Sequence, residues 1–395
     1  MTRQNKAIFS ACTASLIGMA NMVTTSVLAY IYQAYPNIPK NQITLILLIP
    51  SLVGIFVSFL IGPVSTIIPK KIILIFACIC VTCSGGIFYF MGGRCPIGLL
   101  LFGGALLGFV MGTMASVPSS IITENSSPEN RGKFLGYQTA SLNGGSLVMS
   151  VAGGILGASR WQNAYLLLFL SVPVLLVVLF CLPMDHPVKV EKNVAVKQKI
   201  PTKVYLICFH FALMFICFYT FAVNISTYII TEYQLGTSAQ TGIVQALQTI
   251  CGIIAGITFG RIVKVLKKWT VPFSCLIVAI GFMATALMTG SMAGCIIGSI
   301  LLGFGKSFVM PYAINQISAT APGPLIPTCI SSLMGCMNLG MFISNYVIAF
   351  LAGLFGAVTV FSQFAVCALL SVITAVLAFF LYTADGKKAN NPREA

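Results

Sequence analysis

Residues 124–133 read Glu124-Asn125-Ser126-Ser127-Pro128-Glu129-Asn130-Arg131-Gly132-Lys133, a polar stretch between two long apolar runs. The apolar run that follows carries small residues at regular intervals, at Gly136, Gly145, Gly153 and Gly154. We therefore expect a charged turn on one side of a membrane, leading into a helix with small residues along one face. Small residues let transmembrane helices approach closely. The spacing fits static packing and a sliding interface equally well.

The composition excludes a water-soluble domain. Of 395 residues, 58% are hydrophobic and only 7% are charged, whereas soluble domains carry about 25% charged residues. The apolar runs are long enough to cross a membrane as helices, and they are continuous rather than alternating, which excludes a transmembrane β-barrel. The short N-terminal segment Met1 to Lys6 is basic, and the apolar stretch after it is too long for a signal peptide, so we expect a first spanning helix there.

We predict an all-α membrane protein with twelve transmembrane helices in two six-helix halves. The expected spans are 7–31, 44–68, 72–91, 97–123, 134–158, 164–183, 204–230, 239–263, 271–290, 294–318, 329–355 and 359–383. Between the sixth and seventh, residues 184–203 form the longest polar segment and contain five lysines. The expected organisation is a half at 1–183, a cytoplasmic linker at 184–203, and a half at 204–395 that ends in a short cytoplasmic tail.

The basic residues indicate the orientation. The net charge is +15, and all but four of the 22 Lys and Arg residues fall on one side of the predicted membrane. The exceptions are Lys40, Arg94, Arg160 and Lys306. Positive charge gathers in cytoplasmic loops, so we expect both termini in the cytoplasm and a location in the cytoplasmic membrane. This distribution also explains the positive charge without a nucleic-acid partner.

Short repeats support two halves. Residues 106–109 (Leu-Leu-Gly-Phe) recur at 301–304, and Asn143-x-Gly145 recurs as Asn338-x-Gly340, both at an offset of 195. Gly62 with Lys70-Lys71 is followed near the same offset by Gly256 with Lys267-Lys268. Such matches in corresponding spans indicate duplicated halves of parallel topology.

Together, these features resemble the major facilitator superfamily over essentially the whole chain. Residues 62–71 resemble the family's G-x-x-x-D-R-x-G-R-K loop, with Gly62, Lys70 and Lys71 matching and Thr66 in place of the acidic residue. The run after Gly136 resembles the family's antiporter helix, but Met149-Ser150 replaces its Gly-Pro. The arginine that drug–proton antiporters carry in helix four is replaced by Gly104. Both departures weaken an exporter assignment.

The resemblance implies gating or conformational roles for a set of glycines and basic residues. These are Gly62, Lys70, Lys71, Arg131, Gly136, Gly145, Gly153, Gly154 and Arg261.

Lys306 is the one basic residue expected near the middle of a span. A lysine there costs about 2.5–3.5 kcal/mol on insertion scales. Gly305 and Ser307 leave room around its amine, and the repeat-equivalent residue is Met111. We interpret Lys306 as a contact for an anionic substrate group such as a carboxylate. The alternative is a lysine that is neutralised, or bonded to backbone carbonyls, between helices.

Other mid-span polar residues are candidates for substrate binding, and the resemblance places the central cavity among the helices that carry them. They are Asn21, Asn143, Asn224, Gln248, Asn338, Tyr219 and Tyr312. Each one alone is equally consistent with joining two helices, at about 0.6 kcal/mol per bond.

The titratable residues argue against several chemistries. All seven acidic residues lie outside the span centres, and neither His186 nor His210 sits at mid-depth. Carboxylate-based proton coupling therefore has no obvious residue. We expect no metal, no cofactor and no catalytic residues, and the fourteen cysteines are expected as reduced apolar residues.

The sequence therefore predicts a transporter rather than an enzyme. We expect alternating access to a central site for a small organic solute, first an organic anion, by facilitated diffusion or exchange. The alternative is an exporter of amphipathic drugs or lipid-like compounds. A channel is disfavoured because no charged ring or re-entrant filter is evident. The expected partners are the small-molecule substrate and the lipid bilayer, and the chain is expected to act as a monomer.

Overall fold

A computed structural model describes residues 3–65, 67–184, 200–322, 325–356 and 358–383. Every regular element in these ranges is helical, as predicted. The α-helices are α1 (Arg3–Ser15), α2 (Met22–Ala34), α3 (Lys40–Ser65), α4 (Lys70–Gly86), α5 (Ile97–Asn125), α6 (Pro128–Gly157), α7 (Ser171–Cys181), α8 (Thr202–Ser226), α9 (Ser238–Leu266), α10 (Thr270–Leu287), α11 (Met292–Thr320), α12 (Ile326–Leu354) and α13 (Val360–Thr383). Tighter or wider helical turns occupy η1 (Ile87–Met91), η2 (Trp161–Leu170), η3 (Thr227–Glu232) and η4 (Lys267–Trp269).

The first predicted span is interrupted. Within the described residues, eleven helices are long and apolar enough to cross a membrane, and the predicted span 7–31 is divided into α1 and α2. Between them the backbone makes tighter i→i−3 bonds, such as Gly18 N–H to the Ser15 carbonyl at 3.0 Å. Counted as one interrupted span, α1 and α2 bring the number to the predicted twelve.

The charged turn at 124–133 is much shorter than the sequence suggested. α5 continues to Asn125 and α6 already begins at Pro128. Proline fits the first turn of a helix because its fixed φ is helical and its missing N–H would have had no partner there. Most of the polar stretch therefore belongs to two helix ends.

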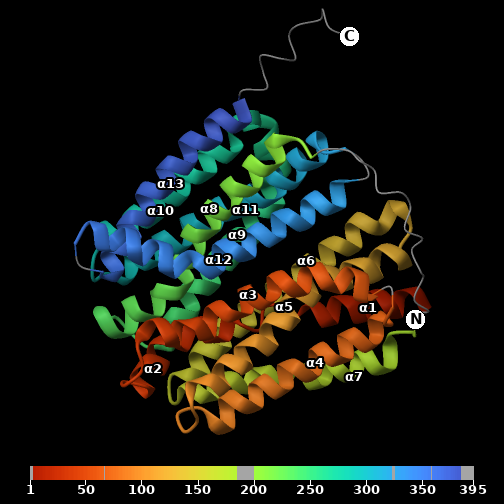
Figure 1. The fold of residues 1–395 in the computed structure, drawn as a ribbon, viewed down its shortest axis with the longest axis horizontal. Helices are drawn as coiled ribbons and strands as arrows, with labels where there is room; N and C mark the ends of the chain where they lie inside the picture. The colour runs from red at the N-terminus through yellow and green to blue at the C-terminus, as the bar shows by residue number, and fades with distance from the viewer. Residues whose placement is uncertain (1–2, 66, 185–199, 323–324, 357, 384–395) are drawn as a thin grey trace, which may run out of the picture. The chain divides into compact units, whose positions relative to one another are not determined.

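Contacts divide the chain into two compact units, residues 1–195 with 225–246, and residues 196–224 with 247–395. In the first, α3 packs on α5, and α4 packs on both α5 and α7 (Figure 1). Its core includes Tyr165, whose ring stacks on that of Phe88 with the ring centres 4.2 Å apart. The hydroxyl of Tyr165 lies 3.0 Å from Thr24 Oγ1. The segment 225–246 belongs to the predicted second half in the sequence but packs with this unit.

The second unit is organised around α10. This helix packs on α11 and α13 (Figure 1). Three buried aromatic side chains join the helices, since the ring of Phe221 lies 5.6 Å from Phe364 and 6.3 Å from Phe282. Ser274 on α10 donates to the Gly305 carbonyl on α11 at 2.5 Å.

Repeat-related glycines make equivalent close approaches in the two units. A Cβ added at Gly108 would lie 2.7 Å from the Pro50 carbonyl oxygen, and one at Gly303 would overlap the Gln248 carbonyl. Likewise Gly145 lies against the Leu16 carbonyl, and a Cβ at Gly340 would lie 2.5 Å from the Ala212 oxygen. Both pairs are 195 residues apart. The repeats in the sequence are therefore repeats of backbone contact.

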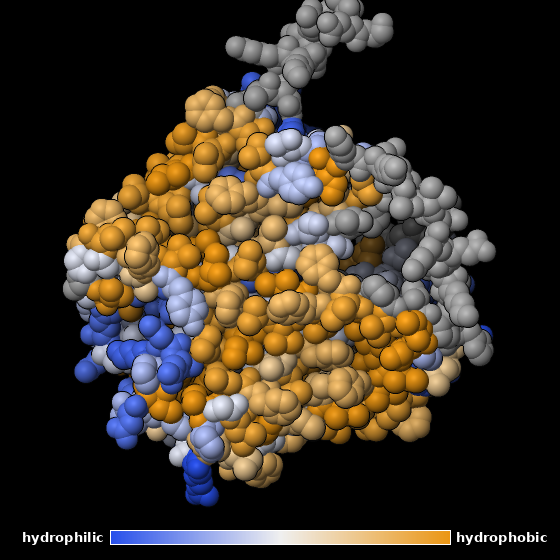
Figure 2. Space-filling model, in the orientation of Figure 1, coloured by the Kyte–Doolittle hydropathy of each residue, from blue (hydrophilic) through white to orange (hydrophobic). Residues whose placement is uncertain are grey.

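The outward-facing side chains are predominantly apolar. Phe56, Phe180, Ile257 and Phe350 are all more than 60% exposed, and apolar side chains dominate the face shown in Figure 2. Water would make such a surface costly, whereas lipid tails are as apolar as these residues. This confirms a multi-pass membrane protein.

Candidate functional site

Lys306 lies in the middle of α11 and its side chain is exposed. The ammonium lies 5.8 Å from the centre of the Phe215 ring on α8, within the range of a cation–π contact. Within the described residues, no carboxylate lies within ion-pair distance of the Lys306 ammonium. The ion pair that the described structure shows joins Lys70 to Glu124 instead. Lys306 is thus an accessible cation that faces a neighbouring helix and has no anionic partner in the described part of the chain.

The two predicted tyrosines lie on the helices that carry Phe215 and Lys306. Tyr219 follows Phe215 by one turn on α8, so the two share a helix face, and both are nearly buried. On α11 itself, Tyr312 is nearly buried and its ring lies 5.3 Å from that of Tyr382. Phe215 was missed at the sequence level, although its i, i+4 spacing to Tyr219 was a usable signal.

Asn21 sits where α1 and α2 are interrupted. Its side chain is 2% exposed, and neither amide atom has a hydrogen-bond partner among the described residues. A buried amide without partners costs about 1–3 kcal/mol. One turn further along, the Thr25 hydroxyl bonds to the Gln245 side chain. Asn143 on α6 is half-buried and makes no hydrogen bond that the structure shows for the described residues.

The other predicted polar residues differ in how well they are satisfied. Asn224 donates to the Thr220 carbonyl of its own helix at 3.0 Å. Asn338 on α12 is 4% exposed, and its Oδ1 has no partner within the described residues. Gln248 on α9 is half-buried, and its backbone carbonyl lies against Gly303.

The predicted site residues are distributed over both units. Asn21 and Asn143 belong to the first unit, and six belong to the second. Those six are Lys306, Asn224, Gln248, Asn338, Tyr219 and Tyr312.

The basic residues of the predicted loop motif bind nearby helix ends. Lys70 at the start of α4 forms an ion pair with Glu124 at the end of α5. Lys71 donates to the Leu179 carbonyl, near the end of α7, at 2.8 Å. The ion-pair partner of Lys70 is therefore a carboxylate on α5. Thr66, at the family's acidic position, lies outside the described residues.

Of the other predicted gating residues outside the glycine series, Arg261 on α9 is exposed. Gly62 and Arg131 fall within α3 and α6, but their surroundings lie outside the described residues.

The glycines along α6 serve different purposes. A Cβ at Gly136 would meet nothing within 4 Å, and one at Gly153 would make ordinary contacts at 3.6 Å. Gly145 and Gly154 have no such room, since a Cβ would overlap the carbonyls of Leu16 and Ser238. Ser238 also donates to the Gly154 carbonyl at 2.6 Å. Close backbone approach therefore requires glycine at 145 and 154, but not at 136.

The remaining titratable residues have structural surroundings. His210 on α8 is buried, and its Nε2 lies 3.1 Å from the Thr374 carbonyl on α13, so it joins two helices. All fourteen cysteines are free thiols. In the described ranges, no group of three or more His, Cys, Asp or Glu side chains is arranged to hold a metal ion.

Comparison with known families decides the class of this protein. The sequence pattern of the Major Facilitator Superfamily matches residues 10–239 and 207–395. The chain belongs to the major facilitator superfamily. The resemblance seen in the loop motifs is thereby confirmed, and the family is one of transporters rather than enzymes. No curated protein sequence matches the chain.

Solved structures of the superfamily share the fold over nearly the whole chain. A bacterial homologue of the human lysosomal transporter Spinster, inward-facing and unoccupied, matches with a TM-score of 0.72 at 15% identity, covering 99% of each chain. The nucleoside transporter NupG matches with a TM-score of 0.76 at 12% identity, covering 95% of this chain and 100% of that one. The POT family transporter PepTSo matches with a TM-score of 0.75 at 13% identity, covering 99% of each. At these identities the likeness establishes the fold alone.

Proposed function

We propose that this membrane transporter carries a small organic anion and that Lys306 binds its negatively charged group. The observation that carries the proposal is the exposed residue Lys306 in the middle of α11, whose ammonium has no carboxylate partner among the described residues. Intramembrane cations are costly and mark substrate pathways when they face the interior of a helix bundle. The contact with Phe215 on α8 supports this direction.

The surroundings of Lys306 favour an anion with an apolar body. Met310, one turn along α11, is exposed on the same helix face, and the Phe215 ring covers the ammonium. A carboxylate would supply the missing counter-charge, and a charge-assisted hydrogen bond to it contributes about 1.5–3 kcal/mol. Asn338 Oδ1, on the neighbouring helix α12 in the same unit, is a candidate acceptor for a substrate hydroxyl or amide.

The proposed transport mechanism follows from the family. The halves at 1–183 and 204–395, joined by the linker 184–203, would alternate access to the substrate by rocking. No acidic residue occurs near a span centre in the sequence, so we favour facilitated diffusion or anion exchange over proton symport. The basic residues predict that both termini are cytoplasmic and that the protein lies in the cytoplasmic membrane.

A second candidate is the export of amphipathic drugs or lipid-like compounds. The specific observation in its favour is the apolar and aromatic environment of Phe215 and Met310 beside the single cation. Two changes in the family motifs argue against it, namely Met149-Ser150 at the Gly-Pro position and Gly104 at the arginine position.

A thermal-shift screen would test the proposal directly. Purified protein is heated with a panel of mono- and dicarboxylates and a panel of hydrophobic cations. A ligand that binds the folded state stabilises it by about 2.7 kcal/mol at a hundredfold excess over Kd. We expect carboxylates to raise the melting temperature of the wild type and to have little effect on Lys306→Met, which reproduces the residue of the first half.

Two variants complete the experiment. Lys264→Met removes an exposed lysine near the end of α9 and is expected to respond like the wild type. Lys306→Arg retains the charge and should keep part of the shift. If carboxylates stabilise Lys306→Met as well as the wild type, the anion-binding role of Lys306 is wrong. A response to hydrophobic cations only would favour the exporter.

A further inference from the structure

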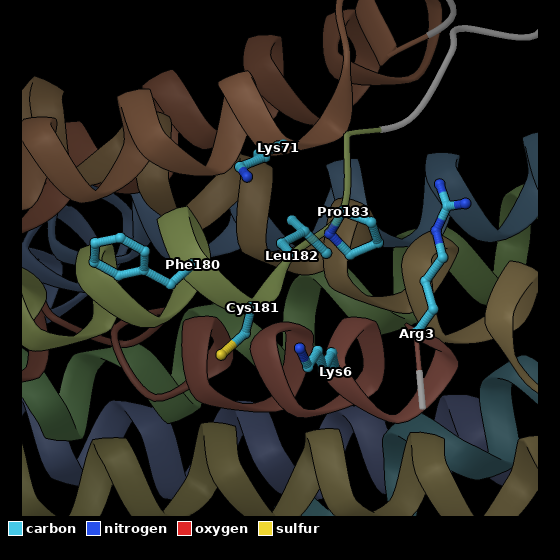
Figure 3. A pocket seen from close by; sticks show the side chains of 7 residues that line it. All are labelled: Arg3, Lys6, Lys71, Phe180, Cys181, Leu182 and Pro183. Carbon is cyan, nitrogen blue, oxygen red and sulfur yellow. The ribbon is translucent and has the colours of Figure 1, made fainter. Parts of the chain in front are cut away.

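A pocket lined by three cations lies at one end of the first unit, and Lys306 is not among its lining residues. It has a volume of about 400 Å³ and lies where α1, α4 and the end of α7 meet. Figure 3 shows Lys6 on α1 and Lys71 on α4 on either side of the segment 180–183, with Arg3 beyond. The lining residues are Arg3, Lys6, Lys71, Phe180, Cys181, Leu182 and Pro183.

The lining carries positive charge without any acidic side chain. Lys71 is half-buried and donates to the Leu179 carbonyl at 2.8 Å. An ammonium has three donors, so this bond orients Lys71 and uses only one of them. The neighbouring Lys70 is directed to Glu124 instead. Two cations from α1 and one from α4 line the same pocket and repel each other, and an anion in the pocket would relieve that repulsion.

The surroundings of the pocket are apolar and outward-facing. On α4, Ile72, Phe76 and Ile79 are exposed at the spacing of one helix face, starting next to Lys71. On α7, Leu176 and Phe180 are exposed, and Phe180 is 82% exposed while also lining the pocket. The cations therefore lie at the polar end of a surface suited to hydrocarbon chains.

We propose that this pocket binds the headgroup of an anionic phospholipid. The phosphate would lie among Arg3, Lys6 and Lys71, and the acyl chains would lie along the exposed faces of α4 and α7. Basic pockets at the ends of transmembrane helices recognise such headgroups through charge and hydrogen bonds. A free phosphate would satisfy the cations equally, but it would leave the adjoining apolar surface of Phe76 and Phe180 unused.

Native mass spectrometry of the full chain in detergent tests this proposal. The protein is titrated with dioleoylphosphatidylglycerol or, at equal mole fraction, dioleoylphosphatidylcholine, and bound lipids are counted. We expect phosphatidylglycerol to be retained preferentially. The double variant Arg3→Gln/Lys6→Gln should bind it about 25-fold more weakly, since each basic residue near an anionic membrane surface contributes about fivefold in affinity. Lys71→Gln should weaken it as well.

The control removes the same charge elsewhere. The control variant Lys264→Gln/Lys268→Gln changes exposed residues near the end of α9 and in η4, and it should bind phosphatidylglycerol like the wild type. If the control loses as much affinity for phosphatidylglycerol as the Arg3→Gln/Lys6→Gln variant, the lipid is attracted by the overall positive charge, and the proposed pocket site is wrong. Displacement of the lipid by inorganic phosphate at equal concentration would identify a free-anion site and overturn the lipid as occupant.

Among the acidic residues of the chain, Asp185 is nearest in sequence to the lining, two residues after Pro183 and outside the described residues. The variant Asp185→Asn separates the two occupants. Preference for phosphatidylglycerol in both wild type and Asp185→Asn supports the proposal. Preference that appears only in Asp185→Asn would show that the chain neutralises its own cations, and would overturn it.

Discussion

Position 111 in the first half is Met, and position 306, its counterpart 195 residues later, is Lys. Met111 is 8% exposed on α5, whereas Lys306 on α11 is exposed and reaches Phe215. Yet the neighbouring glycines make equivalent contacts. Gly108 lies against the Pro50 carbonyl on α3, and Gly303 lies against the Gln248 carbonyl on α9. The two halves therefore share the contacts that pack helices and differ in the charge available for binding.

The first helix of each half shows a second difference. α1 and α2 are interrupted at 16–21, whereas α8, the counterpart, runs unbroken from Thr202 to Ser226. Each region nevertheless provides the carbonyl against which a repeated glycine packs, that of Leu16 at the start of the interruption and that of Ala212 on α8. The interruption leaves Asn21 buried without partners. Duplication preserved the packing position but not the continuity of the helix.

The largest expected effect comes from making the first half resemble the second. Met111→Lys would place a cation at a nearly buried position, which we expect to lower the free energy of unfolding by about 3 kcal/mol. The reverse change, Lys306→Met, should leave stability unchanged or higher, since it removes a costly charge. Thermal unfolding of both variants in the same detergent measures this. Equal destabilisation by the two substitutions would contradict the expected difference between the environments of residues 111 and 306.

The repeated glycines should respond alike in the two halves. Gly145→Ala and Gly340→Ala would each force a Cβ into a neighbouring carbonyl, at an expected cost of about 1–3 kcal/mol. Gly144→Ala is the matched control, because a Cβ there meets nothing within 4 Å. Its stability should stay near that of the wild type. A cost confined to one half, measured by thermal unfolding, would contradict the shared packing.

The interruption of the first helix predicts a smaller effect. Asn21→Leu removes a buried amide without partners in the described structure, so we expect stability to rise by about 1 kcal/mol. Asn224→Leu breaks the bond to the Thr220 carbonyl and should not be stabilising. Thermal unfolding without added solute compares the two. A loss of stability in Asn21→Leu equal to that in Asn224→Leu would show that the amide of Asn21 is satisfied.

The smallest expected effect concerns the ion pair at the start of α4. Glu124 is 55% exposed, and exposed pairs typically contribute at most about 1 kcal/mol. Lys70→Gln and Glu124→Gln should each lower stability by less than that, and the difference should diminish at high salt. A double-mutant cycle at two salt concentrations checks it. A coupling that is large and independent of salt would indicate a buried pair.

Local sequence signals predicted much of this architecture. Spans such as α5 and α10 were located because about 20 consecutive apolar residues suffice to cross a membrane. The repeats at 106–109 and 301–304 predicted the duplication because glycine is needed wherever two helix backbones touch. The family followed from the loop residues Gly62, Lys70 and Lys71. None of these features depends on the arrangement of distant segments.

The candidate site was only partly predictable. Lys306 stood out because a charge in an apolar run is visible in the sequence alone. That Phe215 covers it, and that Asn224 is satisfied by its own helix while Asn338 Oδ1 is left without a partner in the described residues, required the structure. Hydrogen bonding depends on the positions of neighbouring atoms, which no spacing rule specifies.

The sequence by itself determined the membrane class, the helical spans, the duplication and the isolated charge at Lys306, because hydropathy and the need for small residues are local properties. Tertiary structure alone decided that the first span is interrupted at 16–21 and that Arg3, Lys6 and Lys71 line one pocket. Each of these depends on packing between segments far apart in the chain. The lipid environment requires helices, because backbone polar groups have no other hydrogen-bond partners there. Contacts between the helices then determine which polar side chains are hydrogen-bonded and which remain available to a ligand.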